Sequence, residues 1–423
     1  MEIESEKLVE LTRGLVLEGF EPHYGARAQA FSASPVWAKM RELGSELWLD
    51  TGDIAAAGKL WTREMGALTT NNTLLNKEVQ KGTYDTLVTR AANALRKAFP
   101  AMDEAFLVRE IAFVLNAYHG LRLVEQFDAF VSVEEHTDLA HDVAAAVGYA
   151  RRYHAICPER FIVKLPLTAA GLLAAAQVGT EGIPVNLTLG FGARQNVLVT
   201  AVARPRFCNV FLGRLNQVVT ENKLGDGQYV GEKATMASQR VVKALGRSLG
   251  APTKQIAASL RSGEQVRDLA GVDVLTIPPA AADEFARTTK DAAALSSAVE
   301  KAYEPRWAAG VDAKAWALDS LWDVPYGLER AALEIVSIPD LDPAGLLKSL
   351  KDAGFGAVLP QWSKEDVAAA TQDGKIPKLA RWKDRLAKGE IGLDALMNLH
   401  GLQSFVIDQK AMDDRIRGLI GKK

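Results

Sequence analysis

The chain has 423 residues, and its 50 lysine and arginine side chains against 52 aspartate and glutamate side chains give a formal net charge of −2. This balance excludes a strongly charged nucleic-acid-binding tail as the main feature of the protein. Two cysteines, Cys157 and Cys208, are too few for a disulfide framework. No stretch approaches the roughly 18 uninterrupted apolar residues of a membrane helix, and the acidic residues 1–7 do not form a signal peptide. The composition therefore predicts a cytoplasmic protein without a nucleic-acid or membrane partner.

Residues 1–46 are expected to form a helical N-terminal extension. Leu8, Leu11 and Leu15 recur at helical spacing. Glycine and proline residues, including Pro22 and Gly25, then interrupt the pattern before a second amphipathic run at 36–43.

Eight short apolar runs alternate with longer helical patterns over residues 47–279. The runs cover residues 47–50, 67–70, 129–134, 160–166, 184–189, 207–213, 255–259 and 272–278. Strands separated by helices pair in parallel, because each return connection needs a dozen or more residues. The pattern predicts an α/β fold, a (β/α)8 TIM barrel with its catalytic core at 47–279 and additional helices at the N-terminus and in the C-terminal third.

The last third of the chain is expected to be mostly helical. Residues 280–395 predict a helical insertion or small subdomain, within which 339–360 fits a helix followed by a short strand. The basic stretch at 375–390 fits either contact with an acidic partner or a solvated helix face. Residues 396–423 are expected to form a C-terminal helix that packs on the barrel, and its amphipathic part at 404–420 suits either the barrel mouth or a subunit interface.

Lys164 is the most informative single residue. In FIVKLPL it follows three apolar residues, which places its amine inside a poorly solvated barrel. Burial disfavours the charged form of an amine, and a neutral lysine is a nucleophile for Schiff-base formation. The alternative is a lysine at a strand end that reaches solvent or pairs with Glu134 or Glu135.

Other polar residues that close apolar runs are candidates for the same barrel mouth. Asp50 and Glu134 suit a general acid/base pair, although each also fits a helix cap or a solvated loop acid. Amide and hydroxyl groups that either orient a substrate or complete turns are supplied by Asn71, Asn186 and Thr188. The candidates for phosphate binding are Arg214, Ser259 and Arg261. For the two arginines, the alternative is a solvated surface position.

A metal site is not expected from the histidines. His136 and His141 are five residues apart, which departs from the i, i+4 spacing of zinc ligands on a helix, and no cysteine cluster joins them.

Seven segments occur in the order and approximate spacing of transaldolase motifs, so the chain resembles the transaldolase family. They are LWLDTGD, GALTTNN, VSVEEHTDLAHD, FIVKLPLTAAG, GIPVNLTLGF, VFLGRL and ASLRS. The resemblance implies a (β/α)8 barrel that works without a metal or organic cofactor. It implies Lys164 as the Schiff-base lysine, Asp50 as the group that moves protons, and Glu134 acting with a water and Thr188. The substrate-binding residues that it implies are Asn71, Asn186, Asn209, Phe211, Arg214, Ser259 and Arg261.

The activity implied by the resemblance is transfer of a dihydroxyacetone unit from a ketose phosphate, such as fructose 6-phosphate or sedoheptulose 7-phosphate, to an aldose phosphate in the pentose phosphate pathway. The partners expected are therefore small-molecule sugar phosphates, and a homo-oligomer is the general expectation for such an enzyme.

One alternative is the fructose-6-phosphate aldolase branch, which releases free dihydroxyacetone. Members of that branch have Gln and Tyr where this chain has Glu134 and Phe211. Another alternative is a catalytically silent barrel that binds sugar phosphates. Asn209 stands where many transaldolases have a serine, which bears on the choice of donor.

Overall fold

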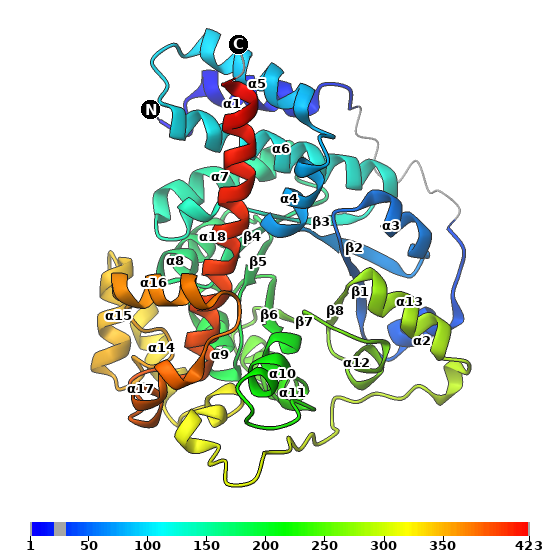
Figure 1. Cartoon of the computed structure of the whole chain (residues 1–423), viewed down its shortest axis with the longest axis vertical. Helices are drawn as coiled ribbons and strands as arrows, with labels where there is room; N and C mark the ends of the chain where they lie inside the picture. Colours follow the sequence, from blue (N-terminus) through cyan, green and yellow to red (C-terminus); the bar gives the residue numbers. More distant parts are fainter. Residues whose placement is uncertain (1, 21–30, 422–423) are drawn as a thin grey trace.

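The computed structural model of the chain describes residues 2–20 and 31–421. Its centre is a closed barrel of eight parallel strands, in which each strand pairs with the next along the chain and the last pairs with the first (Figure 1). The strands are β1 Glu46–Asp50, β2 Met65–Thr69, β3 Phe130–Glu134, β4 Phe161–Pro166, β5 Val185–Thr188, β6 Phe207–Phe211, β7 Lys254–Ala258 and β8 Val274–Ile277. The predicted (β/α)8 fold is confirmed, and each of the eight apolar runs overlaps one strand.

Helices follow every strand and surround the barrel. The helices of this ring are α3 Ile54–Leu60, α4 Asn72–Gln80, α5 Asp85–Ala98, α6 Glu104–Phe127, α7 Val143–Ile156, α8 Ala169–Thr180, α9 Ala193–Val202, α10 Leu212–Glu221, α11 Val230–Ser248, α12 Gly263–Asp268 and α13 Pro279–Thr288. Short polar side chains begin several of them. The Asp53 carboxylate, for example, accepts the N–H of Ala56 at 2.9 Å and caps α3. Such caps set where the chain leaves the barrel mouth.

Five strands end earlier than the apolar runs that predicted them, and the differences at β6 and β7 bear on Arg214 and Ser259. The run at 207–213 is too long, because β6 ends at Phe211 and α10 begins at Leu212. Arg214 therefore lies in the first turn of a helix. Strand β7 ends one residue before the end of the run at 255–259, because Ser259 has a left-handed backbone with φ of 67° and cannot continue the strand.

Helices α1 Glu6–Leu17 and α2 Pro35–Glu42 precede the barrel. Helix α1 packs against α5, α6 and α7, and the guanidinium of Arg152 on α7 joins the layers. It donates to the hydroxyl of Thr12 at 3.1 Å and pairs with the buried Glu110 at 2.5 Å. The predicted break at Pro22 and Gly25 lies outside the described residues.

The insertion after the barrel contains four α-helices joined by loops and short 3-10 turns, namely α14 Leu328–Val336, α15 Pro343–Asp352, α16 Lys364–Asp373 and α17 Lys383–Ala387. Helix α14 packs on α9, α15 on α8 and α16 on the C-terminal helix. The short strand predicted within 339–360 is wrong. After α15 the chain turns, with the N–H of Val358 donating to the carbonyl of Phe355 at 3.0 Å. A closed barrel also offers no free edge with which such a strand could pair.

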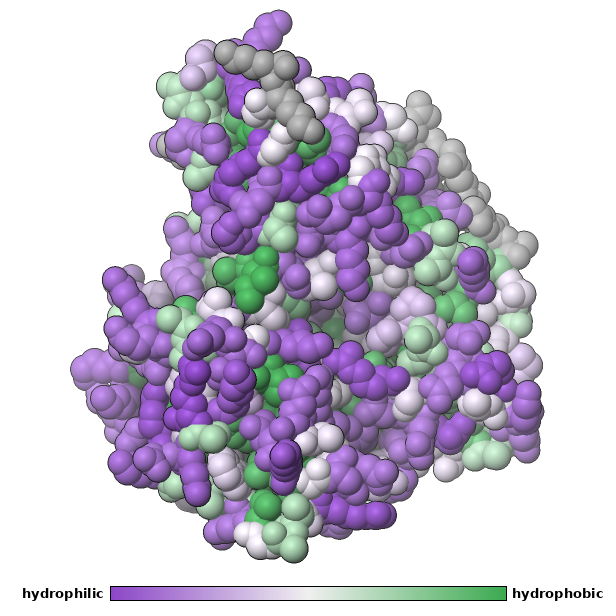
Figure 2. All heavy atoms as spheres, viewed as in Figure 1, coloured by the Kyte–Doolittle hydropathy of each residue, from purple (hydrophilic) through white to green (hydrophobic). Residues whose placement is uncertain are grey.

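The C-terminal helix α18 Leu393–Ile420 begins three residues before the predicted start at 396. Figure 1 shows it, in red, running from the insertion helices to the end of the molecule that holds α1 and α5. Met412 and Ile416 are buried on its inner face. None of the helices within the described ranges has both the length and the apolar content needed to cross a membrane. In keeping with this, hydrophilic residues cover most of the face seen in Figure 2, and apolar residues appear there in small groups.

Candidate active site

A cavity of about 360 Å³ lies at the C-terminal ends of the barrel strands. Ten of the eleven predicted site residues line it, namely Asp50, Asn71, Lys164, Asn186, Thr188, Asn209, Phe211, Arg214, Ser259 and Arg261. The eleventh, Glu134, is not part of the cavity wall and instead contacts Lys164. The barrel thus brings together residues that are spread over more than 200 positions of the sequence.

Lys164 lies on β4, register-paired with Glu134 of β3 on one side and Asn186 of β5 on the other. Only 4% of its surface is exposed, which rules out the alternative of a lysine that reaches solvent. Its Nζ donates to the carbonyl of Thr70 at 3.2 Å and lies 3.6 Å from Oε1 of Glu134. The aromatic ring of Phe405 covers the amine, with its centroid 5.8 Å from Nζ. The amine is therefore held in place and shielded from bulk water.

Two carboxyl groups accompany this amine. Burial raises the pKa of Asp50, and the positive charge of Lys164 and a hydrogen bond from the Thr69 hydroxyl at 3.0 Å oppose that rise. Burial likewise raises the pKa of Glu134, opposed by Lys164 and by the N–H of Asn72 at 3.1 Å. Both groups hold a proton at higher pH than exposed carboxyl groups do, so both are suited to exchanging protons with a bound molecule.

The polar groups of β5 and β6 form a second part of the cavity wall. Asn186 donates to the hydroxyl of Ser132 at 3.1 Å and accepts from Nδ2 of Asn209 at 3.3 Å. Thr188 is fully buried, yet its hydroxyl has no hydrogen-bond partner within the described ranges. A buried hydroxyl without a partner costs free energy unless a bound molecule satisfies it. Thr188 is therefore a candidate contact for a water or a substrate group.

Asn71 combines the two interpretations considered for it. Its side-chain carbonyl accepts the N–H of Leu74 at 2.8 Å and caps α4, as a turn-forming asparagine would. Its amide nitrogen has no partner among the residues that the structure describes, and the residue lines the cavity.

Two arginines converge on the opposite part of the cavity. Arg214 is 9% exposed, donates to the hydroxyl of Ser404 at 3.2 Å, and lies over the rings of Phe211 and Phe405, each 5.6 Å away. Burial, together with the nearby charge of Arg261, lowers the pKa of Arg214 to about 10, and burial lowers that of Arg261 as well. Both remain cationic at neutral pH. Two desolvated like charges in one cavity favour an anionic ligand between them.

Gly213 allows these two arms of the site to approach each other. A Cβ atom at this position would lie 2.0 Å from the backbone carbonyl oxygen of Ser259. Only glycine therefore lets the start of α10, which carries Arg214, pack directly on the end of β7.

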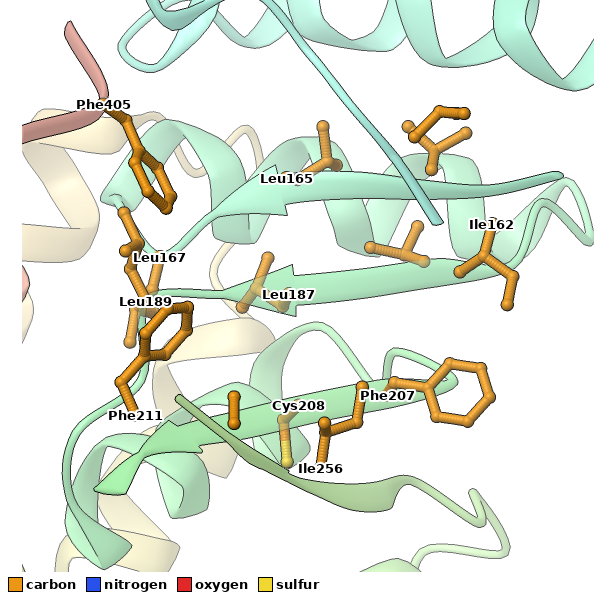
Figure 3. Close-up of a cluster of buried hydrophobic side chains, with 14 of the residues drawn as sticks. Ile162, Leu165, Leu167, Leu187, Leu189, Phe207, Cys208, Phe211, Ile256 and Phe405 are labelled. Atoms are coloured by element: carbon orange, nitrogen blue, oxygen red, sulfur yellow. The ribbon is translucent and has the colours of Figure 1, made fainter. Parts of the chain in front are cut away.

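Several residues of the cavity wall escaped prediction. Helix α18 supplies Ser404, Phe405 and Asp408, α4 supplies Lys77, and the loop after α16 supplies Lys375. Figure 3 shows Phe405 extending from α18 toward the ends of the neighbouring strands, where Phe211 also lies. The amphipathic run at 404–420 was a signal for the α18 residues, but it does not identify which of them face the mouth.

Helix α18 is anchored on the loops that follow β4 and β5. The side-chain amide of Asn398 donates to the carbonyls of Leu167 and Leu189 at 3.0 and 2.9 Å. The buried carboxylate of Asp394 pairs with Arg194 at 2.6 Å. The helix thus forms a fixed wall of the cavity.

The cavity wall carries five basic and two acidic side chains, a formal excess of three positive charges. No group of three or more His, Cys, Asp or Glu side chains is placed to hold a metal ion in the described part of the chain. The fold and this site define a (β/α)8-barrel enzyme whose candidate active site holds a buried amine beside two carboxyl groups.

Comparison with known proteins agrees with this class. The model of the Transaldolase/Fructose-6-phosphate aldolase family matches residues 47–323, well over half of the chain. The chain belongs to this family, as its motifs predicted. It is 34% identical over 251 residues to a transaldolase of Xanthomonas euvesicatoria, covering 57% of this chain and 75% of the relative. It is 31% identical over 281 residues to a transaldolase of Thermosynechococcus vestitus, covering 64% and 68%. A transaldolase of Prochlorococcus marinus is 30% identical over 246 residues, covering 56% and 72%.

Proposed function

We propose that the protein is a transaldolase that transfers a dihydroxyacetone unit from a ketose phosphate to an aldose phosphate through a Schiff base on Lys164. Fructose 6-phosphate and sedoheptulose 7-phosphate are the proposed donors. The observation that carries the proposal is the burial of the Lys164 amine in a cavity that it shares with Asp50, with the Glu134 carboxyl group 3.6 Å away. The names of relatives at 30–34% identity support it.

The first half of the proposed reaction builds and cleaves an imine. The neutral amine of Lys164 attacks the C2 carbonyl of the ketose phosphate. Glu134, whose raised pKa favours its acid form, gives a proton to the departing hydroxyl, and water leaves as the protonated imine forms. Asp50 then accepts the proton of the C4 hydroxyl as the C3–C4 bond breaks. The electron pair of that bond moves into the iminium group to give an enamine, and an aldose phosphate departs.

The second half reverses these steps with another aldehyde. The enamine carbon adds to the carbonyl carbon of an acceptor aldose phosphate, and Asp50 returns its proton to the new C4 oxygen. Hydrolysis of the imine then releases the new ketose phosphate. The shielding of Lys164 by Phe405 supports this order, because a dry site keeps the enamine from being protonated and released.

The remaining side chains take supporting roles in the proposal. Asn71 and Asn186 hold substrate hydroxyls, and the unpartnered hydroxyl of Thr188 binds the water that Glu134 uses. The phosphate lies between the guanidinium groups of Arg214 and Arg261, with the hydroxyl of Ser259. Asn209 and Phe211 shape the wall near the dihydroxyacetone unit. We propose that this activity belongs to the pentose phosphate pathway and that the protein acts in the cytoplasm.

The test is an assay of the full-length protein with fructose 6-phosphate in the presence and absence of erythrose 4-phosphate. Formation of sedoheptulose 7-phosphate that depends on the acceptor, and that is lost in Lys164→Met, supports the proposal. Release of free dihydroxyacetone at a comparable rate without acceptor favours the aldolase alternative. Binding of fructose 6-phosphate without either product favours the silent barrel.

A further inference from the structure

The insertion after the barrel contributes one residue, Lys375, to the wall of the candidate active site. It belongs to the basic stretch at 375–390, for which the sequence left two interpretations. The stretch does not form one helix, because a loop at 374–378 leads into a 3-10 turn at Leu379–Arg381 and then into α17. The interpretation of this segment as one continuous solvated helix face is therefore wrong.

The loop that carries Lys375 is fixed at both ends. On one side, Nδ1 of His400 on α18 donates to the carbonyl of Gly374 at 2.8 Å. On the other, the side chain of Asn222 at the end of α10 donates to the carbonyl of Pro377 at 2.9 Å and accepts the N–H of Leu379 at 2.8 Å. The loop thus joins α18 to α10, the helix that carries Arg214.

These anchors place Lys375 on the Arg214 side of the mouth. His400 lies one helical turn before Ser404 on α18, and Ser404 accepts the hydrogen bond of Arg214. The helix that holds the loop therefore also contacts the proposed phosphate site.

The ammonium group of Lys375 is exposed, and it makes no ion pair or hydrogen bond within residues 2–20 and 31–421. Its basic neighbours differ from it, because Lys378 and Arg381 both pair with Asp373, at 3.8 and 3.3 Å. Arg385 pairs with Asp366 at 2.7 Å. The anchored loop thus presents an uncompensated positive charge to a cavity that already holds two arginines.

We propose that Lys375 binds the phosphate group of the sugar substrate from the open side of the cavity, and so sets the preference of this enzyme for phosphorylated over neutral sugars. This inference rests on the proposed function for the identity of the substrate. Arg214 and Arg261 hold two phosphate oxygens with planar guanidinium groups, and an ammonium group acts on the remaining charge as a point cation. In this proposal the insertion has a role in substrate binding, because it brings a third cation to the barrel mouth.

The test compares Lys375→Gln and Lys375→Arg with the matched control Lys364→Gln, an exposed lysine of the same insertion outside the cavity. Two readouts are measured on the full chain: the KM and kcat for fructose 6-phosphate, and the Kd for inorganic phosphate by calorimetry without turnover. For Lys375→Gln we expect KM and Kd to rise about three- to tenfold, with kcat within twofold. Lys375→Arg should restore most of the affinity, and Lys364→Gln should match the unmodified protein. The effect should shrink in 0.5 M NaCl, because exposed charges are screened.

An unchanged Kd for phosphate in Lys375→Gln, or an equal change in Lys364→Gln, overturns the inference. A loss of kcat with unchanged KM and Kd overturns it as well, because a loop that only supports the catalytic residues would behave in that way. If the unmodified protein lacks transaldolase activity, the proposed function fails separately, and the phosphate titration still decides the role of Lys375.

Discussion

Lys164 and Glu134 face each other across adjacent parallel strands, with 3.6 Å between Nζ of the lysine and Oε1 of the glutamate. Residues paired in register on neighbouring strands direct their side chains to the same side of a sheet. The barrel itself therefore places a carboxyl group next to the amine, and no loop movement is needed to bring them together. This contact shows that Lys164 pairs with Glu134, and the pairing is compatible with the proposed role of Lys164 as a nucleophile.

The pH dependence of turnover should reveal the raised pKa of Asp50. In the proposed reaction Asp50 must be ionised to accept the C4 proton, so the rate should rise with pH. Because burial raises its pKa, the midpoint of that rise in kcat/KM should lie above the ordinary value of about 3.9. Asp50→Asn should lower kcat at least about 100-fold and abolish this limb of the profile. A midpoint at or below the ordinary value would contradict the role given to Asp50.

Replacing Thr188 by valine should reduce turnover without destabilising the fold. The hydroxyl of Thr188 has no partner among the residues that the structure describes, so its removal leaves none of those groups unpaired. We expect kcat to fall about 10- to 100-fold and the free energy of unfolding to stay within about 0.5 kcal/mol or to rise.

Thr168→Val is the matched control for this substitution. The Thr168 hydroxyl accepts the N–H of Gly171 at 2.9 Å and donates to the carbonyl of Ala140 at 2.5 Å. Its loss should cost about 1–2 kcal/mol in a urea titration. Equal stability losses in the two variants would show that Thr188 is a structural residue.

Glu135 should make the stability of the protein depend on pH. Its carboxyl group is 3% exposed, neither oxygen has a partner within the described residues, and burial raises its pKa well above the usual range. A raised native pKa contributes stability below the unfolded pKa of about 4.3, and this contribution is lost as the pH rises toward the native value. Glu135→Gln, which mimics the protonated acid, should therefore gain stability over the unmodified protein between pH 5 and pH 8, by at most about 1.4 kcal/mol per pH unit.

The free energies of unfolding of both proteins at several pH values check this expectation. The exposed Glu365→Gln serves as a control, and its difference from the unmodified protein should stay constant. A constant difference for Glu135→Gln as well would mean that Glu135 reaches water or a partner in solution.

Gly213→Ala should damage the phosphate side of the site. The added methyl would meet the carbonyl of Ser259 at 2.0 Å, so α10 and the end of β7 must move apart. We expect a loss of about 1–3 kcal/mol of stability and a KM for fructose 6-phosphate raised at least about tenfold, the factor that corresponds to 1.4 kcal/mol of binding. Gly58→Ala is the control, because its Cβ meets nothing within 4 Å and alanine favours a helix. If Gly213→Ala retains both its stability and its KM, the close approach is not required.

The barrel was predictable because its strands are buried on both sides and read as short apolar runs, which makes a polar residue such as Lys164 conspicuous. The cap at Asp53 depends on neighbouring residues alone, so features of this kind can also be predicted from the sequence. The contributions of Phe405 and Lys375 were not, because they depend on how α18 and the insertion pack across the mouth. The position of Arg214 in the first turn of α10 was not predicted either, because the apolar run at 207–213 indicated a single strand. Local patterns thus identified many of the side chains that line the cavity, and long-range packing determined the rest of the cavity wall.

Borohydride reduction of the full-length protein in the presence of fructose 6-phosphate tests most directly whether Lys164 forms the Schiff base. Digestion and mass spectrometry then locate any adduct. We expect a reduced dihydroxyacetone unit on Lys164, and no adduct in Lys164→Met. An adduct on another lysine, or none in a preparation that turns over fructose 6-phosphate, would contradict it.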